Sequence, residues 1–265
     1  MNITVYLGSR SGNRSCYADY AYALGAWIAR HGHTLVYGGS RTGLMGKLAD
    51  GALQAGGQVI GVEPQFFMDE ELQHEGLTKL IVTPDMTSRK QQMMDLGDIF
   101  LAFPGGIGTL EEISQVMSQV KLHQMEGRFA FLDFDGYYQP MKALIQQMSD
   151  EGFVDEDWAD AVPFLPSFAA LTAFVLGRDL PRPGETWRHF KNHMYRILDL
   201  ADDAETGETY VVYKTLYGEY RDFIRPLDMF LSEVDHDKYP AVRQICKHSP
   251  EQEKARQRRA FLYLI

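Results

Sequence analysis

The amino-acid sequence predicts an α/β protein, with a Rossmann-like, doubly wound parallel sheet over residues 1–180 and a small, mostly β domain over 181–265. Two observations carry this prediction. Short runs that are apolar throughout alternate with helix-like segments up to residue 178, which is typical of parallel strands covered by helices on both faces. Glycine-rich loops follow three of these runs, at the strand ends where such sheets bind ligands.

The expected elements of the first domain follow one another in a regular order. Strands are expected at 3–7, 34–37, 58–62, 79–82, 99–103, 129–134 and 161–164, where apolar residues are contiguous. Helices are expected at 17–29, 43–55, 87–96, 110–123, 138–148 and 168–176, where apolar residues recur at helical spacing.

The chain changes character after residue 180. The run Pro181-Arg182-Pro183-Gly184 indicates a linker. Beyond it, strands are expected at 193–200, 210–216 and 223–226, a hairpin turn at 204–208, one or two helical turns at 227–234 and a helical tail at 250–265.

Charge and cysteine content limit the classes of function. The net charge of -10 arises within residues 1–180, which contain 12 basic and 22 acidic side chains, so we expect no nucleic-acid partner for this domain. Cys16 and Cys246 lie in no zinc-ligand spacing and are too few for a disulfide framework. No basic leader or membrane-length apolar run is present, which predicts a cytoplasmic protein without a membrane partner.

The glycine-rich loops at 8–12, 38–46 and 104–112 predict a phosphate or nucleotide site. Glycine allows the backbone to approach a phosphate closely, and the helix after each loop presents free N–H groups and the positive end of its dipole. The spacing matches neither G-x-G-x-x-G nor the P-loop pattern. A dinucleotide cofactor or hydrolysis of a nucleoside triphosphate is therefore not favoured.

Two side chains near these loops each allow two interpretations. Glu112 either completes a capping box with Thr109, or faces the ligand as a carboxylate. Arg89 shares a helix face with apolar residues, so it either extends over that face toward solvent or binds phosphate or ribose oxygens.

Two motifs carry a resemblance to a known family. Residues 104–112 match P-G-G-x-G-T-x-x-E in full, and Met86, Arg89, Lys90 and Met93 match M-x-x-R-K-x-x-M. With the glycine stretches at 37–46 and 55–62, residues 1–178 resemble the LONELY GUY family, the cytokinin-activating phosphoribohydrolases. The resemblance implies a Rossmann-like homodimer, a site near the subunit interface, and Arg89 with Glu112 as the catalytic pair.

The chain departs from the family pattern at two positions. Ser40 stands where many members have a third glycine, and Arg10 where many have a second serine. Many relatives have been labelled lysine decarboxylases, but no lysine here is marked out for a Schiff base with pyridoxal phosphate.

The reaction that the resemblance implies is hydrolysis of the N-glycosidic bond of a purine nucleoside 5'-monophosphate, which yields the free base and ribose 5-phosphate. Glu112 would stabilise the oxocarbenium-like sugar or orient water, and Arg89 would hold ribose or phosphate oxygens. We expect no metal and no organic cofactor. The other expected substrate-binding residues are Gly8, Ser9, Gly38, Gly39, Gly43, Met45, Met86, Lys90, Gly105, Gly106, Gly108 and Thr109.

Two further hypotheses concern binding rather than catalysis. A non-catalytic carrier of a nucleotide or of molybdenum cofactor could use the same scaffold, although the presence of both Arg89 and Glu112 favours an enzyme. Residues 195–230 resemble a small bacterial domain of unknown function, which supplies no activity. The second domain would then be a binding adaptor or a clamp for the dimer.

Overall fold

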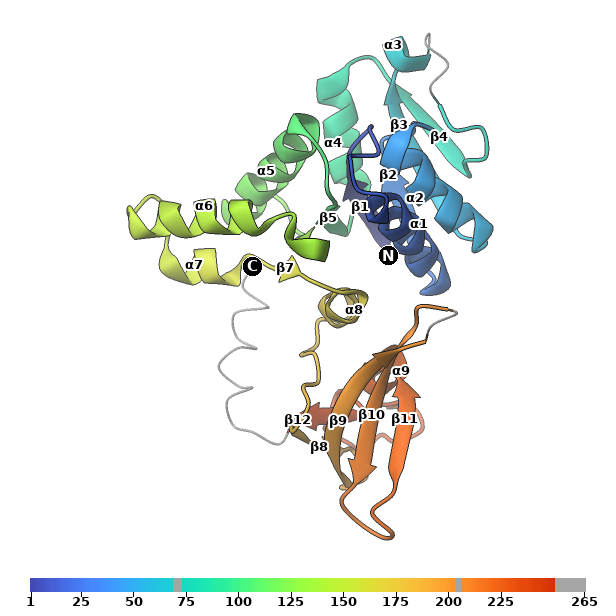
Figure 1. The fold of residues 1–265 in the computed structure, drawn as a ribbon, viewed down its shortest axis with the longest axis vertical. Coiled ribbons are helices and arrows are strands. Elements are labelled where there is room, and N and C mark those ends of the chain that lie inside the picture. The colour runs from blue at the N-terminus through green and yellow to red at the C-terminus, as the bar shows by residue number, and fades with distance from the viewer. Residues whose placement is uncertain (69–72, 204–205, 251–265) are drawn as a thin grey trace. The chain divides into compact units, whose positions relative to one another are not determined.

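The computed structural model describes residues 1–68, 73–203 and 206–250 (Figure 1). Contacts between Cα atoms divide the chain into two compact units, Met1–Pro166 and Ser167–Ile265. None of the helices in the described ranges is both long enough and apolar enough to cross a membrane.

The first unit is built on a seven-stranded parallel sheet with the strand order β4-β3-β2-β1-β5-β6-β7 (Figure 1). This confirms the predicted Rossmann-like, doubly wound class. The strands are β1 Asn2–Tyr6, β2 Thr34–Tyr37, β3 Gln58–Pro64, β4 Lys79–Thr83, β5 Ile99–Ala102, β6 Arg128–Leu132 and β7 Phe164–Leu165. The helices are α1 Cys16–Arg30, α2 Gly43–Gln54, α3 Gln65–Met68, α4 Met86–Leu96, α5 Ile107–Lys121, α6 Gln139–Asp150 and α7 Glu156–Ala161, with a short 3-10 turn at Phe134–Gly136.

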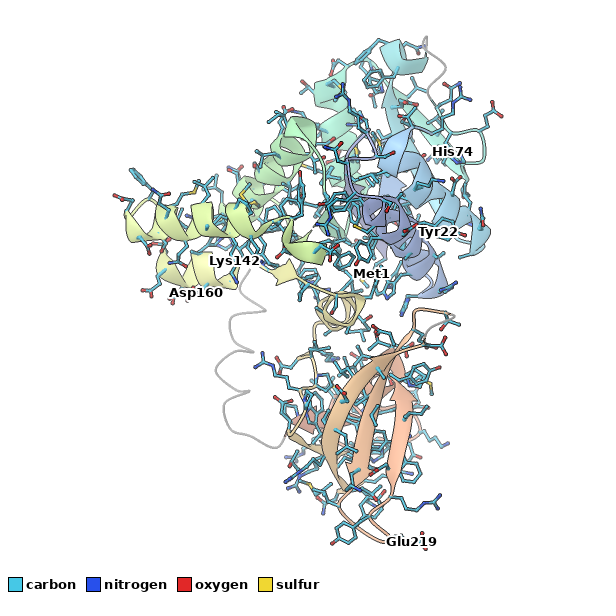
Figure 2. All side chains as sticks on the ribbon, in the orientation of Figure 1. Met1, Tyr22, His74, Lys142, Asp160 and Glu219 are labelled. Carbon is cyan, nitrogen blue, oxygen red and sulfur yellow. The ribbon has the colours of Figure 1, made fainter. Side chains whose placement is uncertain are left out.

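Both faces of this sheet are buried, as apolar strands require. On β2, Val36 belongs to a core that includes Met93 of α4 and Val116 of α5. Leu35 points to the opposite face, because side chains alternate along a strand, and it is also fully buried. The helices α1 and α2 pack against each other, and the hydroxyl of Tyr22, labelled in Figure 2, donates to Gln54 at 2.7 Å.

The register of β1 places three loops at one edge of the sheet. β1 pairs with β2 and with β5, with Thr4 opposite Val36 and Tyr6 opposite Ala102. Because these strands are parallel, the loops after β1, β2 and β5 leave the sheet at its carboxyl edge. These are the three loops in which the sequence concentrates glycine.

The second unit contains a five-stranded antiparallel sheet with the strand order β11-β10-β9-β8-β12. Its elements are α8 Phe168–Leu176, β8 Thr186–His189, β9 Met194–Asp202, β10 Thr209–Thr215, β11 Asp222–Pro226, α9 Leu227–Leu231 and β12 His248–Pro250. Trp187, Ile197 and Phe230 lie in its core, together with Ala169 and Ala173 of α8. Contacts thus group α8 with this unit, whereas the domain boundary expected near residue 180 places it in the first domain.

Several expected elements differ in the structure. The prediction of a strand at 161–164 is wrong, because Ala161 ends α7 and the strand β7 is Phe164–Leu165. The helices α3 and α7 and the strands β8 and β12 were not predicted. The expected hairpin turn includes residues 204 and 205, and the expected tail includes 251–265, which lie outside the described residues.

Candidate active site

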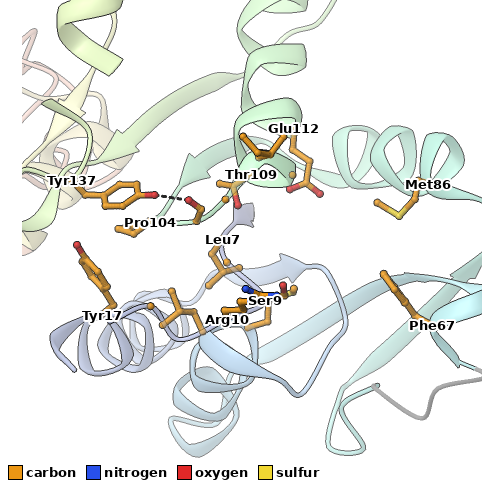
Figure 3. A pocket seen from close by; sticks show the side chains of 18 of the residues that line it. Leu7, Ser9, Arg10, Tyr17, Phe67, Met86, Pro104, Thr109, Glu112 and Tyr137 are labelled. Atoms are coloured by element: carbon orange, nitrogen blue, oxygen red, sulfur yellow. Dashed lines mark hydrogen bonds between the residues drawn. The ribbon is translucent and has the colours of Figure 1, made fainter. Parts of the chain in front are cut away.

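A cavity of about 560 Å³ opens at the carboxyl edge of the first unit's sheet (Figure 3). Its walls come from the loop after β1, from the start of α2, and from the loop that joins β5 to α5. It is lined by Leu7, Gly8, Ser9, Arg10, Gly12, Tyr17, Leu44, Met45, Phe67, Met86, Arg89, Pro104, Gly105, Gly106, Ile107, Gly108, Thr109, Glu112 and Tyr137.

The loop before α5 presents backbone donors to this cavity. Gly106 is the N-cap of α5 and has no side chain to accept the first N–H groups of the helix. A Cβ atom at Gly105 would lie 2.1 Å from the Thr109 hydroxyl and 2.9 Å from the Gly8 nitrogen, so only glycine fits there. The N–H groups at the start of α5, with the helix dipole behind them, can therefore bind an anion.

Arg89 is held inside the protein at the edge of the cavity. Its Nε donates to the Val62 carbonyl at 2.9 Å, and its Nη1 donates to Glu112 Oε1 at 2.7 Å. Asp85 caps the start of α4 by accepting from the Ser88 N–H at 2.8 Å, which fixes the first turn that carries Arg89. The interpretation that the Arg89 side chain extends toward solvent is therefore wrong, since Arg89 is only 7% exposed.

Glu112 is the partner of Arg89 and points toward the cavity (Figure 3). Burial raises the pKa of the Glu112 carboxyl above its usual range, and the Arg89 guanidinium opposes this rise. The capping-box interpretation is wrong, because α5 begins at Ile107 and Thr109 already lies within its first turn. The carboxylate is thus available to a ligand in the cavity.

Most of the predicted site residues come together here. Besides Arg89 and Glu112, the cavity lining includes Gly8, Ser9, Met45, Met86, Gly105, Gly106, Gly108 and Thr109. Gly38, Gly39, Gly43 and Lys90 are not part of the lining.

The residues outside the lining have other contacts. Lys90 forms an ion pair with Glu111. A Cβ atom at Gly38 would lie 2.3 Å from Arg89 Nη2, and one at Gly43 would lie 2.2 Å from the Ser9 carbonyl oxygen. These two glycines thus allow close packing against Arg89 and Ser9, which line the cavity.

The site predicted from the sequence lacks several lining side chains, including Tyr17, Phe67 and Tyr137. The rings of Tyr17 and Tyr137 meet edge to face with centroids 5.9 Å apart, and the Tyr137 hydroxyl donates to the Gly105 carbonyl at 2.5 Å (Figure 3). Arg10, which the sequence marks as a departure from the family pattern near the expected ligand, also lines the cavity. The other three lie outside the glycine loops, and nothing in their local sequence marks them.

Glu63 lies beside this site without lining it. It is fully buried at the end of β3, and burial raises the pKa of its carboxyl. Among the described residues, neither of its carboxylate oxygens has a hydrogen-bond partner. Gly39 packs closely against it, since a Cβ atom at Gly39 would lie 3.1 Å from that of Glu63.

The arrangement can bind an anion at the start of α5 and present a carboxylate to a group attached to that anion. In the part of the chain that the structure describes, no three His, Cys, Asp or Glu side chains are grouped as metal ligands.

Comparisons with known proteins agree with the motifs. The family model described as "Possible lysine decarboxylase" matches residues 45–173, and that of "Protein of unknown function (DUF1653)" matches 185–245. A protein of Rhodococcoides fascians named cytokinin riboside 5'-monophosphate phosphoribohydrolase is 42% identical over 154 residues, which cover 58% of this chain and 78% of that one. An Arabidopsis thaliana protein of the same name is 38% identical over 152 residues, covering 57% and 67%.

Solved structures support the fold of the first unit. The molybdenum cofactor carrier protein of Chlamydomonas reinhardtii aligns with a TM-score of 0.52, covering 66% of this chain and 94% of that one. Its sequence is 23% identical to this chain, so the likeness concerns the fold alone.

Proposed function

Because this chain belongs to the family of cytokinin riboside 5'-monophosphate phosphoribohydrolases, we propose that its first unit hydrolyses the N-glycosidic bond of a purine nucleoside 5'-monophosphate. The base is of the adenine type, with or without a substituent on N6. The products are the free base and ribose 5-phosphate. The label "Possible lysine decarboxylase" describes a different reaction, which we do not propose.

One observation carries the proposal. The buried pair of Arg89 and Glu112, with 2.7 Å between its charged atoms, lies in the same cavity as the N-terminus of α5. An N-glycosidase of this kind needs an anchor for the phosphate and a carboxylate near the anomeric carbon. The loop at Gly105–Thr109 supplies the anchor in our proposal, and Glu112 supplies the carboxylate.

In the proposed reaction, the bond between C1' and the base nitrogen breaks, and its electron pair leaves with the base. Positive charge develops on the sugar, where the Glu112 carboxylate stabilises it. A water molecule adds to C1', its hydroxyl stays on the sugar, and its proton is transferred through Glu112 to the base. Arg89 holds Glu112 in place and binds ribose or phosphate oxygens.

The direct test is to incubate the purified protein with AMP and with N6-substituted AMP, and to measure the free base by chromatography. Glu112→Gln should lower turnover by at least about 100-fold. Glu111→Gln is the matched control, because Glu111 is the neighbouring acid on α5 and does not line the cavity. If AMP and N6-substituted AMP both stay intact with the unmodified protein, the chain is a carrier rather than a hydrolase.

We further propose that the protein is a cytoplasmic homodimer, as the family resemblance implies. Ile107 lines the cavity and is 82% exposed, which is consistent with a partner subunit close to the site. Sedimentation equilibrium would measure the oligomer. The second unit would then serve as an adaptor or as a clamp for this dimer, and deletion of residues 184–265 would change the dimer affinity only in the second case.

A further inference from the structure

Arg10 brings to the cavity a positive charge that no other described lining residue neutralises. Arg10 and Arg89 are the two cations among its described lining residues. Arg89 donates to the Val62 carbonyl and forms an ion pair with Glu112, so its charge is already balanced. Arg10 is exposed and forms no ion pair with any residue that the structure describes.

The backbone that carries Arg10 is fixed against the glycine loop. The Arg10 carbonyl oxygen lies 3.1 Å from the place of a Cβ atom at Gly8, and the Gly105 Cα lies 3.3 Å from that same place. The Gly8 N–H donates to the Pro104 carbonyl at 3.2 Å. Figure 3 shows Arg10 and Ser9 on the wall opposite Thr109 and Glu112. An anion at the start of α5 therefore lies between that helix and the loop that carries Arg10.

The charge balance of the site leaves a role for this arginine. Helix N–H groups offer partial charges, whereas a nucleotide phosphate carries close to two negative charges at neutral pH. The pair of Arg89 and Glu112 adds no net charge to the cavity. A guanidinium fits phosphate oxygens with two parallel hydrogen bonds, which are stronger than bonds between neutral groups.

We propose that Arg10 is a specificity-determining residue, which binds the 5'-phosphate from the side opposite the glycine loop and selects phosphorylated nucleosides over unphosphorylated ones. This inference rests on the proposed function. In family members with serine at this position, a neutral hydroxyl would stand where this chain has a full charge. The chain thus binds the phosphate with a charged side chain as well as with backbone donors.

The test compares AMP with adenosine as ligands of the full-length protein. The variants are Arg10→Ser, which removes the charge, and Arg10→Lys, which retains it without the planar geometry. Lys47→Ser is the matched control, because Lys47 is an exposed cation of α2 that does not line the cavity. Adenine release gives kcat and KM, and calorimetry gives the dissociation constants.

Arg10→Ser should raise the KM for AMP by about tenfold or more, the effect of one charge-assisted hydrogen bond, with little change in kcat. The affinity for adenosine should stay the same, and Arg10→Lys should recover part of the AMP affinity. The proposal is overturned if Arg10→Ser binds AMP as the Lys47→Ser control does, or if it weakens AMP and adenosine equally. Failure of the proposed function would appear differently, as absent adenine release, and the dissociation constants would still test Arg10.

Discussion

At the scale of single residues, Glu112 combines a buried carboxyl with an ion-pair partner. Burial raises the pKa of Glu112, while Arg89 lowers it. If the carboxylate is the form that acts, kcat/KM falls when Glu112 takes up a proton, so the acid limb of the pH profile should lie above the ordinary value of about 4.3. Arg89→Gln removes the opposing charge, and we expect it to move the acid limb to still higher pH as well as to slow the reaction.

The measurement is kcat/KM for AMP across pH, for the unmodified protein and for Arg89→Gln. Loss of one partner of a buried pair also destabilises a fold, so urea unfolding defines the pH range over which both proteins stay folded. An acid limb at the same pH in both proteins would mean that Glu112 is not the titrating group.

Glu63 is a second buried carboxyl, but one that the proposed reaction does not use. A buried polar group without a hydrogen bond costs about 1–3 kcal/mol, and more when it is charged. Glu63→Met should therefore raise the free energy of unfolding by about 1 kcal/mol or more at pH 7. Because the folded-state pKa of Glu63 is raised, its cost grows as pH rises, so the gain should be smaller at pH 5.

Urea unfolding at both pH values measures this gain. Glu126→Met replaces an exposed glutamate of the same unit and should change stability little at either pH. A loss of stability in Glu63→Met would indicate that the carboxylate is bound by a group such as a water molecule.

Sequence reasoning finds residues that belong to motifs more readily than residues that only share a cavity. Arg89 and Glu112 could be singled out because Arg89 belongs to the motif M-x-x-R-K-x-x-M and Glu112 to the motif P-G-G-x-G-T-x-x-E. Their mutual contact could not, because 23 positions separate them and only the packing of α4 against the sheet brings them together. Tyr137 reaches the cavity from the segment that follows β6 and the 3-10 turn, and no local pattern encodes that approach.

At the scale of elements, Gly43 connects the start of α2 to the loop after β1. Its φ is +57°, and a Cβ atom there would lie 2.2 Å from the Ser9 carbonyl oxygen. Gly43→Ala should cost about 1–2 kcal/mol for the backbone conformation and about 1–3 kcal/mol more for the clash. The displaced loop carries Ser9 and Arg10, so AMP affinity should fall as well.

Gly56→Ala separates these two costs. Gly56 has a φ of +77°, but nothing lies within 4 Å of the place of its Cβ atom. Urea unfolding should therefore show only the conformational cost, and calorimetry should show unchanged AMP affinity. If Gly43→Ala and Gly56→Ala lost equal amounts of stability, the close contact between Gly43 and Ser9 would contribute nothing to the cost.

Elements with clear end signals could be predicted with their bounds. The helix α8 begins after Ser167, whose hydroxyl accepts from the Ala170 N–H at 3.2 Å, and ends at Gly177 with a φ of 62°. The strands β8 and β12 have no such signals. They are short and carry histidine or proline, and their pairing, with His248 opposite His189, depends on contacts far apart in sequence.

At the scale of the whole molecule, the two units have separate cores with different responses to acid. In the second unit, burial lowers the pKa of His248 to about 3 and that of His189 to about 4. Below a pH of about 6.5, the unfolded chain takes up protons at these histidines that the folded unit does not. The stability of the second unit should therefore fall as pH drops from about 6.5 toward 4, by up to about 1.4 kcal/mol per pH unit for the nearly inaccessible His248.

The first unit should respond less to the same change. His33 has a pKa lowered to about 4 and acts in the same direction as the histidines of the second unit. The raised pKa values of Glu63 and Glu112 act in the opposite direction, because the folded unit then holds protons that the unfolded chain has already released. These opposing contributions offset one another.

The NMR signals of nitrogen-labelled tryptophan indole groups can follow the unfolding of each unit separately during urea titrations at pH 7 and pH 5. Trp27 lies in the first unit, and Trp187 lies in the core of the second, where its Nε1 donates to Glu185 at 3.0 Å. The urea midpoint of the Trp187 signal should drop further on acidification than that of Trp27. Equal drops would mean that the units unfold as one, and an unchanged Trp187 midpoint would mean that His248 and His189 do not couple protonation to the fold.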